Sequence, residues 1–283
     1  MRTTFSLHKI DNADSFSFSP TDYSRFKYGD DEAAEKFGTA LAKGFIQHYL
    51  TVGLFEQQIV VISSPYAFIP TATFAMKNYF VFEINKWLAE NNLPVVQETK
   101  VNRLVTYKED YGELNAAERI NLIGNDVFHI DSNFVKNKIL LFLDDIRITG
   151  SHEKMITKML GEYGLENEMY LLYFAELINT AIHPNIENYL NYFSVKSVFD
   201  LNSIIRQERF AINTRIVKYI LNAEPDVFVI FMQNHSVGFL TLLYNMALGN
   251  SYHTIEAYHI NLEILKKEII ALGKQIINST NQK

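Results

Sequence analysis

The chain has 283 residues, enough for one large core or for two domains, and we expect two. Hydrophobic residues make up 48% and charged residues 20%, which excludes a disordered chain, while the formal net charge of -6 argues against a surface for duplex nucleic acid. Cysteine is absent, so disulfides, thiolate metal sites and a cysteine nucleophile are excluded.

The N-terminal segment, Met1 to Phe18, carries scattered polar residues and no apolar run of signal-peptide length. Two longer apolar stretches, 227–232 and 237–248, are separated by polar residues, and neither is long enough to cross a bilayer. We therefore expect a cytoplasmic protein with no membrane partner. The basic and aromatic segment Tyr23 to Gly29 lies near this end, and we interpret residues 1–30 as an anchoring edge or as a hood over a site.

Helical and strand patterns alternate from residue 30 onwards. Asp30 to Leu50 places apolar residues at helical spacing and predicts an amphipathic helix, and a second helix is predicted from Pro70 to Asn91. Between them the β-branched run Gln58 to Ile62 predicts a strand. Val127 to Ile130 is a weaker strand pattern.

The alternation continues through the middle of the chain. Lys138 to Leu143 is a continuous apolar run that predicts a buried strand, stopped by the acid pair that follows it. A helix from Ser151 to Tyr163 and a strand from Met169 to Phe174 come next. Strands that alternate with helices predict an α/β fold whose sheet is mainly parallel and flanked by helices, and we assign it to residues 1–184.

After about Asn185 the pattern changes to long helical stretches with aromatic stripes. Helices are predicted at Val195 to Leu221, Pro225 to Leu248 and Tyr258 to Ile277, although residues 227–231 of the second also fit a strand. A separate α-helical subdomain over residues 185–283 is the simplest account.

The acid pair Asp144 and Asp145 stands at the carboxyl end of a predicted strand, where parallel α/β sheets bind their ligands. Two carboxylates can accept hydrogen bonds from vicinal sugar hydroxyls, and the turn after them offers backbone N–H groups and a helix N-terminus suited to phosphate. Thr149 and Ser151 add hydroxyl groups, and Gly150 allows close backbone approach. A phosphorylated ribose would suit both halves of this motif.

Other classes also place two acids after a hydrophobic strand. The Mg²⁺-binding strand of P-loop ATPases requires G-x-x-x-x-G-K-[ST] upstream, and this sequence lacks it. The haloacid dehalogenase pattern needs an acid where Ile146 stands. A surface turn that caps a helix after a core strand remains as the alternative. His183, His235, His253 and His259 show no metal-ligand spacing.

The run Ile139 to Ser151 resembles the phosphoribosyl pyrophosphate fingerprint of the type I phosphoribosyltransferases: a hydrophobic strand, two acids, three residues, Thr-Gly and a small or hydroxylated residue. The sequence departs from that family at His152, where Thr or Ser usually contacts the phosphate. Arg147 is also unusual, and it fits either a phosphate ligand or the partner of a carboxylate. The resemblance covers about residues 55 to 180 and is closest to uncharacterised members with an extra C-terminal helical region.

The resemblance implies a phosphoribosyltransferase-like fold and a Mg²⁺-dependent transferase that displaces pyrophosphate from phosphoribosyl pyrophosphate with a nitrogenous base or a related acceptor. Asp144 and Asp145 would hold the ribose hydroxyls, directly or through Mg²⁺-bound water, and the loop after them would hold the 5-phosphate. The loop that begins at Ser63 would hold pyrophosphate. The segment Lys100 to Asn121 would be a mobile loop that closes over the site and supplies cations.

These expectations define a set of site residues. The predicted catalytic residues are Asp144, Asp145, Arg103 and Arg119, and the predicted substrate-binding residues are Ser63, Ser64, Pro65, Tyr66, Tyr107, Lys108, Ile146, Arg147, Ile148, Thr149, Gly150, Ser151 and His152. The expected partners are phosphoribosyl pyrophosphate and a small-molecule acceptor, without nucleic acid, and a homodimer is left open. The acceptor pocket is expected under a hood from the N-terminus, the mobile loop or the helical subdomain. The alternative function is a non-catalytic regulator that binds phosphoribosyl pyrophosphate or a nucleotide.

Overall fold

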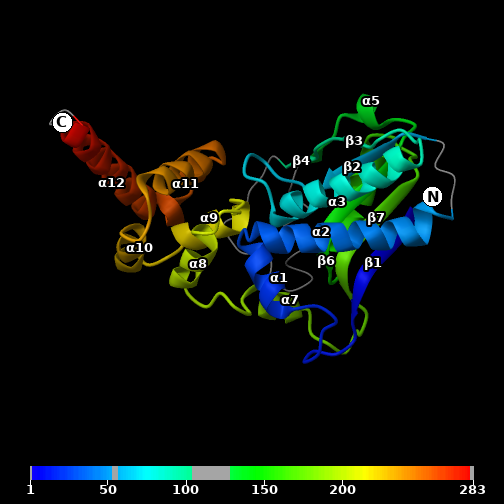
Figure 1. Cartoon of the computed structure of the whole chain (residues 1–283), viewed down its shortest axis with the longest axis horizontal. Helices are drawn as coiled ribbons and strands as arrows, with labels where there is room; N and C mark the ends of the chain where they lie inside the picture. The colour runs from blue at the N-terminus through cyan, green and yellow to red at the C-terminus, as the bar shows by residue number, and fades with distance from the viewer. Residues whose placement is uncertain (1, 53–56, 104–127, 281–283) are drawn as a thin grey trace.

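A five-stranded parallel sheet forms the centre of the larger part of the molecule (Figure 1). The structure is a computed structural model, and it describes residues 2–52, 57–103 and 128–280, with side chains up to residue 273. The strand order is β1-β7-β6-β2-β3, and every pairing in this sheet is parallel. The strands are β1 (Arg2–Ile10), β7 (Met169–Leu177), β6 (Ile139–Arg147), β2 (Ile59–Ser63) and β3 (Gln97–Glu98).

The predicted parallel α/β fold is confirmed, and the edge strand β1 is an addition to it. β1 pairs with β7 from Arg2 opposite Met169 to Ile10 opposite Leu177. Most of its residues are exposed or half-buried, and only Ser6 and Ile10 are buried. An edge strand with so few core positions lacks the apolar alternation by which a strand is recognised in a sequence.

The central strands owe their apolar sequences to burial on both faces. In β2, Ile59 and Val61 belong to one hydrophobic cluster, whereas Val60 and Ile62 belong to another on the opposite face. This division follows from the two-residue period of a strand, whose side chains point alternately to the two sides of the sheet. Helices must therefore cover both faces.

One face is covered by α2 (Asp31–Phe45) and α3 (Ala72–Glu90), which lie in front of the sheet in Figure 1. The other face is covered by α6 (Ser151–Glu162). The two helices α2 and α3 approach closely at Gly38, where an added Cβ would lie 2.2 Å from the carbonyl oxygen of Met76. The predicted helices over these segments are confirmed. The last turn of the first widens into the π-helix η1 (Ile46–Leu50).

Two short elements lie outside the main sheet. β4 (Asn102–Arg103) and β5 (Phe128–His129) form a two-stranded antiparallel ribbon. The weak strand predicted at 127–130 is therefore confirmed in its central two residues. The short helix α5 (Ser132–Val135) then leads into the strand β6.

The C-terminal region is helical, as predicted, but two of its three predicted helices are broken. Residues 195–221 contain η3 (Val198–Leu201), α8 (Asn202–Ile205) and α9 (Thr214–Leu221) instead of one helix. The side chain of Asn213 accepts a hydrogen bond from the Ile216 amide and so begins α9 as an N-cap. A short helix, α7 (Ile186–Asn191), precedes this group.

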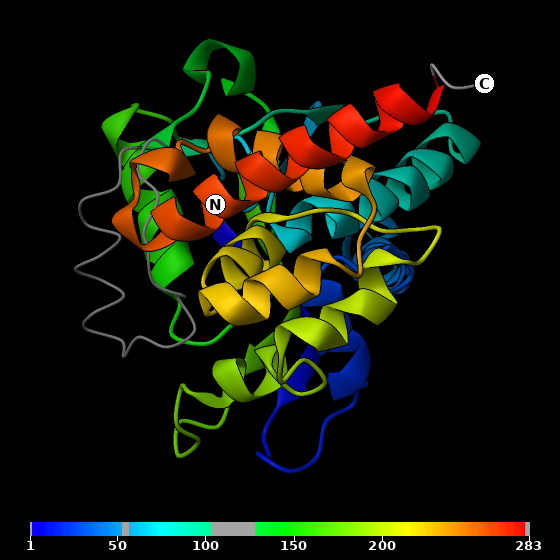
Figure 2. The same cartoon turned by 90° about the vertical axis from the view of Figure 1, so that its left-hand side faces the viewer.

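The second predicted helix is also divided, into α10 (Pro225–Met232) and α11 (Val237–Gly249). Ser236 caps α11 by accepting a hydrogen bond from the Phe239 amide, so the polar residues between the apolar runs form a turn. Residues 227–231 are helical, and the alternative of a strand there is wrong. The 3-10 turn η4 (Tyr252–Thr254) precedes the last helix, α12 (Glu256–Thr280), which confirms the third prediction and packs across α10 and α11 (Figure 2).

The helical region has a hydrophobic cluster of its own, built from residues such as Phe228, Phe231 and Leu240. Tyr28 and Ile69 from the first part of the chain belong to the same cluster. Consequently the helical region is packed directly on the segments that surround the sheet's carboxyl edge. The boundary between residues 184 and 185 stays a prediction.

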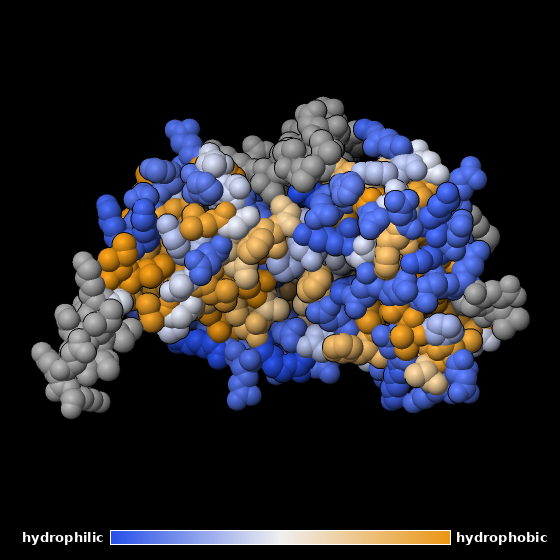
Figure 3. All heavy atoms as spheres, turned by 90° about the horizontal axis from the view of Figure 1, so that it is seen from above, coloured by the Kyte–Doolittle hydropathy of each residue, from blue (hydrophilic) through white to orange (hydrophobic). Residues whose placement is uncertain are grey.

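The helical region also exposes many apolar side chains (Figure 3). Exposed large hydrophobic residues of α10, α11 and α12 are Val229, Ile230, Leu242, Leu248, Ile260 and Ile270. Among the helices that the structure describes, none combines the length and the apolar character needed to cross a bilayer.

Candidate functional site

The acid pair lies where β6 extends past the end of its neighbour β2. Ser63, the last residue of β2, is paired with Leu143, whereas Asp144 is paired only with Tyr173 of β7 on the other side. The prediction that the acids stop the strand is wrong, because pairing with β7 continues to Arg147. β6 has no β2 residue beside it beyond Leu143, and a cavity lies on this side of β6 at the carboxyl edge of the sheet.

This cavity has a volume of about 220 Å³ and brings together most of the predicted site. Its lining includes the predicted residues Ser64, Arg103, Asp144, Asp145, Ile146, Arg147, Ile148, Thr149, Gly150, Ser151 and His152. Ser63 and Pro65 line a small recess on the other side of Ser64 instead. The backbone of Tyr66 forms a parallel bridge with Asn102 of β4, and its carbonyl accepts a hydrogen bond from the Arg103 amide at 3.2 Å.

The other predicted residues of the mobile loop lie outside the described part of the chain. Tyr107, Lys108 and Arg119 belong to residues 104–127, and Arg103 is the last described residue before that segment.

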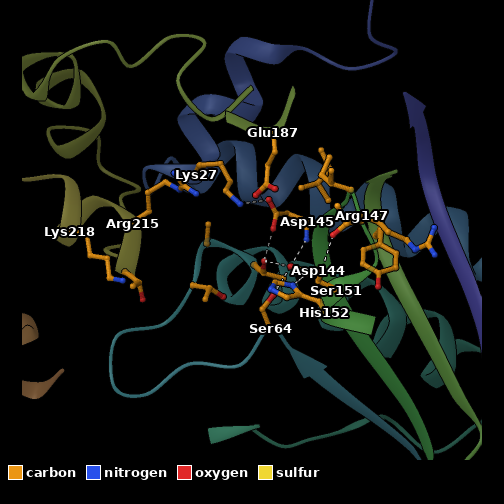
Figure 4. A pocket seen from close by; sticks show the side chains of 18 of the residues that line it. Lys27, Ser64, Asp144, Asp145, Arg147, Ser151, His152, Glu187, Arg215 and Lys218 are labelled. Atoms are coloured by element: carbon orange, nitrogen blue, oxygen red, sulfur yellow. Dashed lines mark hydrogen bonds and ion pairs between the residues drawn. The ribbon is translucent and has the colours of Figure 1, made fainter. Parts of the chain in front are cut away.

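Asp144 is held by hydroxyl and imidazole donors inside the cavity (Figure 4). Its Oδ1 accepts hydrogen bonds from the Ser64 hydroxyl at 2.7 Å and from the Asp145 amide at 3.0 Å, and its Oδ2 is bonded to Nδ1 of His152. Burial favours the neutral acid, but the charge and hydrogen bond of His152, the Ser64 hydroxyl and the charge of Lys27 outweigh it. The pKa of Asp144 is therefore held well below its ordinary value, and the group is a carboxylate at neutral pH.

His152 is the other half of this ion pair. Burial alone would lower the pKa of the imidazole, yet the charge and hydrogen bond of Asp144, followed by the charge of Glu187, raise it above its ordinary value. Its side chain turns toward Asp144, so the imidazole and the first acid of the pair are joined in one ion pair (Figure 4). The sequence departure at His152 therefore has a structural consequence.

Asp145 is buried, with 5% of its surface exposed, and is held by the helix α1 (Pro20–Lys27). Its Oδ2 accepts hydrogen bonds from the Tyr23 hydroxyl at 2.5 Å and from Nζ of Lys27. Its Oδ1 has a long contact of 3.4 Å with the hydroxyl of Thr73 at the start of α3. Burial, followed by the charge of Asp145, raises the pKa of Tyr23 well above its ordinary value, so this hydroxyl stays a donor.

The turn after the acids forms the N-terminus of α6. Gly150 adopts a left-handed conformation with φ of 70° and precedes the first helical residue, Ser151. A positive φ at this position favours glycine over any residue with a Cβ. The hydroxyls of Thr149 and Ser151 are 2.7 Å apart, and the amides of the first helical turn start at the cavity wall. This geometry suits an anion such as a phosphate group.

Arg147 takes the second of its two predicted roles. Its guanidinium donates to Glu153 at 3.0 Å and to Glu176 at 2.5 Å, so it joins β6 to α6 and β7. Burial alone would lower its pKa, but the two carboxylates raise it. The side chain also lies along the cavity wall.

The cavity also has polar residues that were absent from the predicted set, among them Lys27, Thr73, Glu187, Arg215 and Lys218. Lys27 belongs to the segment Tyr23 to Gly29, for which a hood was one of the two interpretations, and the structure places it over Asp145. Arg215 and Lys218 come from α9, on the side of the cavity opposite Arg147 (Figure 4). Their three-residue spacing, which puts them on one helix face, was visible in the sequence. The helix predicted over residues 195–221 was too long, so it did not show that this face would line the cavity.

Comparison with known proteins gives one match over most of the chain. A family model described as "PRTase ComF-like", a phosphoribosyltransferase family, matches residues 1–265. No curated protein sequence matches the chain.

Similar solved structures are distant in sequence. A hypoxanthine phosphoribosyltransferase from Staphylococcus aureus shares 13% identity over 50% of this chain and 74% of that chain, with a TM-score of 0.32. A purine phosphoribosyltransferase from Pyrococcus horikoshii shares 13% identity over 53% and 77%, with a TM-score of 0.28. A Trypanosoma cruzi hypoxanthine phosphoribosyltransferase shares 16% identity over 53% and 77%, with a TM-score of 0.31.

Proposed function

The chain belongs to the ComF-like phosphoribosyltransferase family, and on that premise we propose that it binds phosphoribosyl pyrophosphate and transfers its phosphoribosyl group to a nucleophilic acceptor. The observation that carries this proposal is the placement of two carboxylates and a helix N-terminus in one cavity. In the proposed complex Asp144 and Asp145 would accept hydrogen bonds from the ribose hydroxyls, and the turn at Gly150 would bind the 5-phosphate at the start of α6.

The carboxylates still have capacity for a ligand. Each oxygen of a carboxylate can accept about two hydrogen bonds. Among the described residues, Oδ1 of Asp145 has only the 3.4 Å contact with Thr73, so it is the oxygen best suited to a ribose hydroxyl. Oδ2 of the same residue is held by Tyr23 and Lys27, which fix the orientation of the carboxylate.

In the proposed reaction the bond between C1 of the ribose and a pyrophosphate oxygen breaks, and pyrophosphate leaves with the electron pair. The acceptor nucleophile forms the new bond to C1 and releases its proton to water. The positive charge that develops on the ribose lies next to Asp144 and Asp145, whose negative charges stabilise it. The protein otherwise acts by holding the two reactants in line.

Magnesium fits the chemistry of the acid pair. Mg²⁺ prefers oxygen ligands and is commonly held by one or two carboxylates together with substrate phosphates and water. Asp144 and Asp145 supply the carboxylates, and Ser64 and Thr73 place hydroxyl oxygens beside them. No group of three or more His, Asp or Glu side chains suited to a metal occurs in the described part of the chain. The ion would thus rely on oxygens of the ligand, and when bound it would offset the charge of pyrophosphate.

A second candidate is a protein that binds the same ligand without turnover. The observation that favours it is that both acids already have an internal cation, Lys27 for Asp145 and His152 for Asp144. These cations offset the negative charge that would stabilise a developing positive charge on the ribose, which favours binding without turnover. Pyrophosphate release separates the two candidates.

The test is calorimetric binding of phosphoribosyl pyrophosphate with Mg²⁺, together with a pyrophosphate-release assay over a panel of acceptors. We expect binding to the unmodified protein and a loss of about 10- to 100-fold in affinity for Asp144→Asn with Asp145→Asn, since a hydrogen bond to a charged group contributes about 1.5–3 kcal/mol. The control is Glu162→Gln with Glu166→Gln, which removes two exposed carboxylates elsewhere. Unchanged affinity in a folded acid-pair variant would refute the site, and binding without release for every acceptor would select the sensor.

A further inference from the structure

The wall of the cavity opposite the phosphate turn is one face of the helix α9. Arg215, Lys218, Tyr219 and Asn222 line the cavity, and their spacing of three and four residues places them on the same side of the helix. Ile216, Val217, Ile220 and Leu221 on the other side are buried in the core of the helical region. The burial of that apolar side fixes which side chains α9 presents to the cavity.

This face brings positive charge close to the acid pair. The Tyr23 hydroxyl donates a hydrogen bond to Asp145, and the positive charge of Arg215 is close enough to act on it. Burial and the nearby acids raise the pKa of Tyr23, and the charge of Arg215 partly opposes them. Figure 4 shows Arg215 and Lys218 on one side of the cavity, with Asp144 and His152 on the other. The chain as a whole is acidic, so a cationic wall within this cavity is a local departure from its net charge of -6.

Aromatic rings lie beside the two cations. Tyr192 and Tyr219 both line the cavity, and their ring centroids are 5.8 Å apart. Tyr28 packs behind them at 5.3 Å from Tyr219 and is fully buried. The buried ring supports the two in front of it, so the wall offers aromatic surface next to positive charge. A flat ring with an acidic substituent matches both properties.

We propose that the acceptor of the phosphoribosyl group is a ring compound that carries a carboxylate, bound by Arg215 and Lys218 against Tyr192 and Tyr219. This inference rests on the proposed function, because it assigns the second substrate of the same site. The ribose end of the cavity is occupied by the acid pair and the turn at Gly150, so α9 faces the side from which an acceptor would approach.

The other anion that could meet α9 is the pyrophosphate group of the first substrate. That group has a separate candidate position near Ser64, at the end of β2, which Figure 4 shows apart from Arg215 and Lys218. If Arg215 and Lys218 bind the carboxylate of the acceptor, the affinity for phosphoribosyl pyrophosphate should be almost independent of these two residues. Pyrophosphate on α9 would make that affinity depend strongly on both cations.

The experiment uses pairs of compounds with the same ring, of which one carries a carboxylate and the other the neutral carboxamide: benzoate with benzamide, and nicotinate with nicotinamide. Calorimetry measures their binding to the full chain, without and with phosphoribosyl pyrophosphate and Mg²⁺. We expect the carboxylate of each pair to bind about tenfold more tightly than its amide, and Arg215→Gln with Lys218→Gln to remove that preference. The control, Lys266→Gln with Lys267→Gln, removes two exposed cations of the same helical region and should keep it.

Each outcome of these measurements either supports or overturns the inference. Equal binding of carboxylate and amide to the unmodified protein would overturn the inference. A tenfold or greater loss of affinity for phosphoribosyl pyrophosphate in the α9 variant, with the carboxylate preference retained, would assign α9 to pyrophosphate and also overturn it. If the unmodified protein selects carboxylates but does not bind phosphoribosyl pyrophosphate, the carboxylate site is supported and the proposed function fails.

Discussion

The ion pair between Lys27 and Asp145 gives the strongest prediction for stability. The side chains are 10% and 7% exposed, so neither charge has much access to water. Removing one partner of a buried ion pair costs about 3–5 kcal/mol, because the remaining charge stays buried without compensation. We expect Lys27→Met to lower the free energy of unfolding by about that amount. Tyr23 still donates to Asp145, which places the expected loss nearer the lower limit.

The measurement is urea unfolding at pH 7, followed by the fluorescence of Trp87, the only tryptophan of the chain. Trp87 lies on α3 and packs against the core of the sheet layer, so it reports on the part of the molecule that contains the pair. The matched control is Lys36→Met, whose partner Asp22 lies at the surface.

The side chains of Lys36 and Asp22 are 65% and 33% exposed, and an ion pair of that kind contributes about 0–1 kcal/mol. Combining Lys27→Met with Asp145→Asn should recover about half of the loss or more, because no unpaired charge remains. If Lys27→Met costs no more than the control, or if the double variant is less stable than Lys27→Met alone, the reasoning about the buried pair is refuted.

Three further predictions concern backbone geometry and pH. Gly150→Ala should lower the free energy of unfolding by about 1 kcal/mol and the melting temperature by about 2 °C, because alanine disfavours a φ of 70°, and an unchanged melting curve would contradict this. Gly38→Ala should cost about 3 kcal/mol in urea unfolding, because its Cβ would lie 2.2 Å from a backbone oxygen of α3. Gly161→Ala should cost nothing, because among the described residues its Cβ would meet no atom within 4 Å beyond the backbone of its own helix. His152→Asn should be most destabilising at about pH 5 to 6, where the histidine is protonated and Asp144 ionised, and the difference should shrink as the pH rises through the raised pKa of His152 or falls through the lowered pKa of Asp144. A difference that stays constant from pH 5 to pH 9 would show that the ion pair contributes nothing.

The fold was most predictable where the sequence carries both burial and periodicity. β2 and β6 are almost entirely apolar because helices cover both of their faces, and α12 has a long amphipathic pattern. β1 has neither property, since it is an edge strand with polar residues on much of its surface. The breaks in the helical region depend on caps such as Asn213 and Ser236, which are single polar residues inside otherwise continuous helical patterns.

The candidate site was predictable in the part that is contiguous in sequence. Residues 144–152 run from the end of one strand into the start of one helix, so their motif shows which groups come together. Lys27, Glu187 and Arg215 come from three other helices, and their arrival in the same cavity depends on tertiary packing. No local pattern encodes that packing, so the sequence left the hood open among the N-terminus, the mobile loop and the helical subdomain. The structure brings residues of α1 and α9 to the cavity that holds the acids.

The position of β1 in the sheet has a consequence for the order of events during synthesis. Lys9 of β1 is bonded to Glu176 of β7, and 167 positions separate them in the chain. At about 5–20 residues per second, a ribosome needs roughly 10–30 s to add that many residues. β1 is the first strand of this sheet to be synthesised and β7 is the last, so β1 stays unpaired for the whole of that interval. Its charged and polar residues, Arg2, His8 and Lys9 among them, disfavour pairing with other chains during that interval.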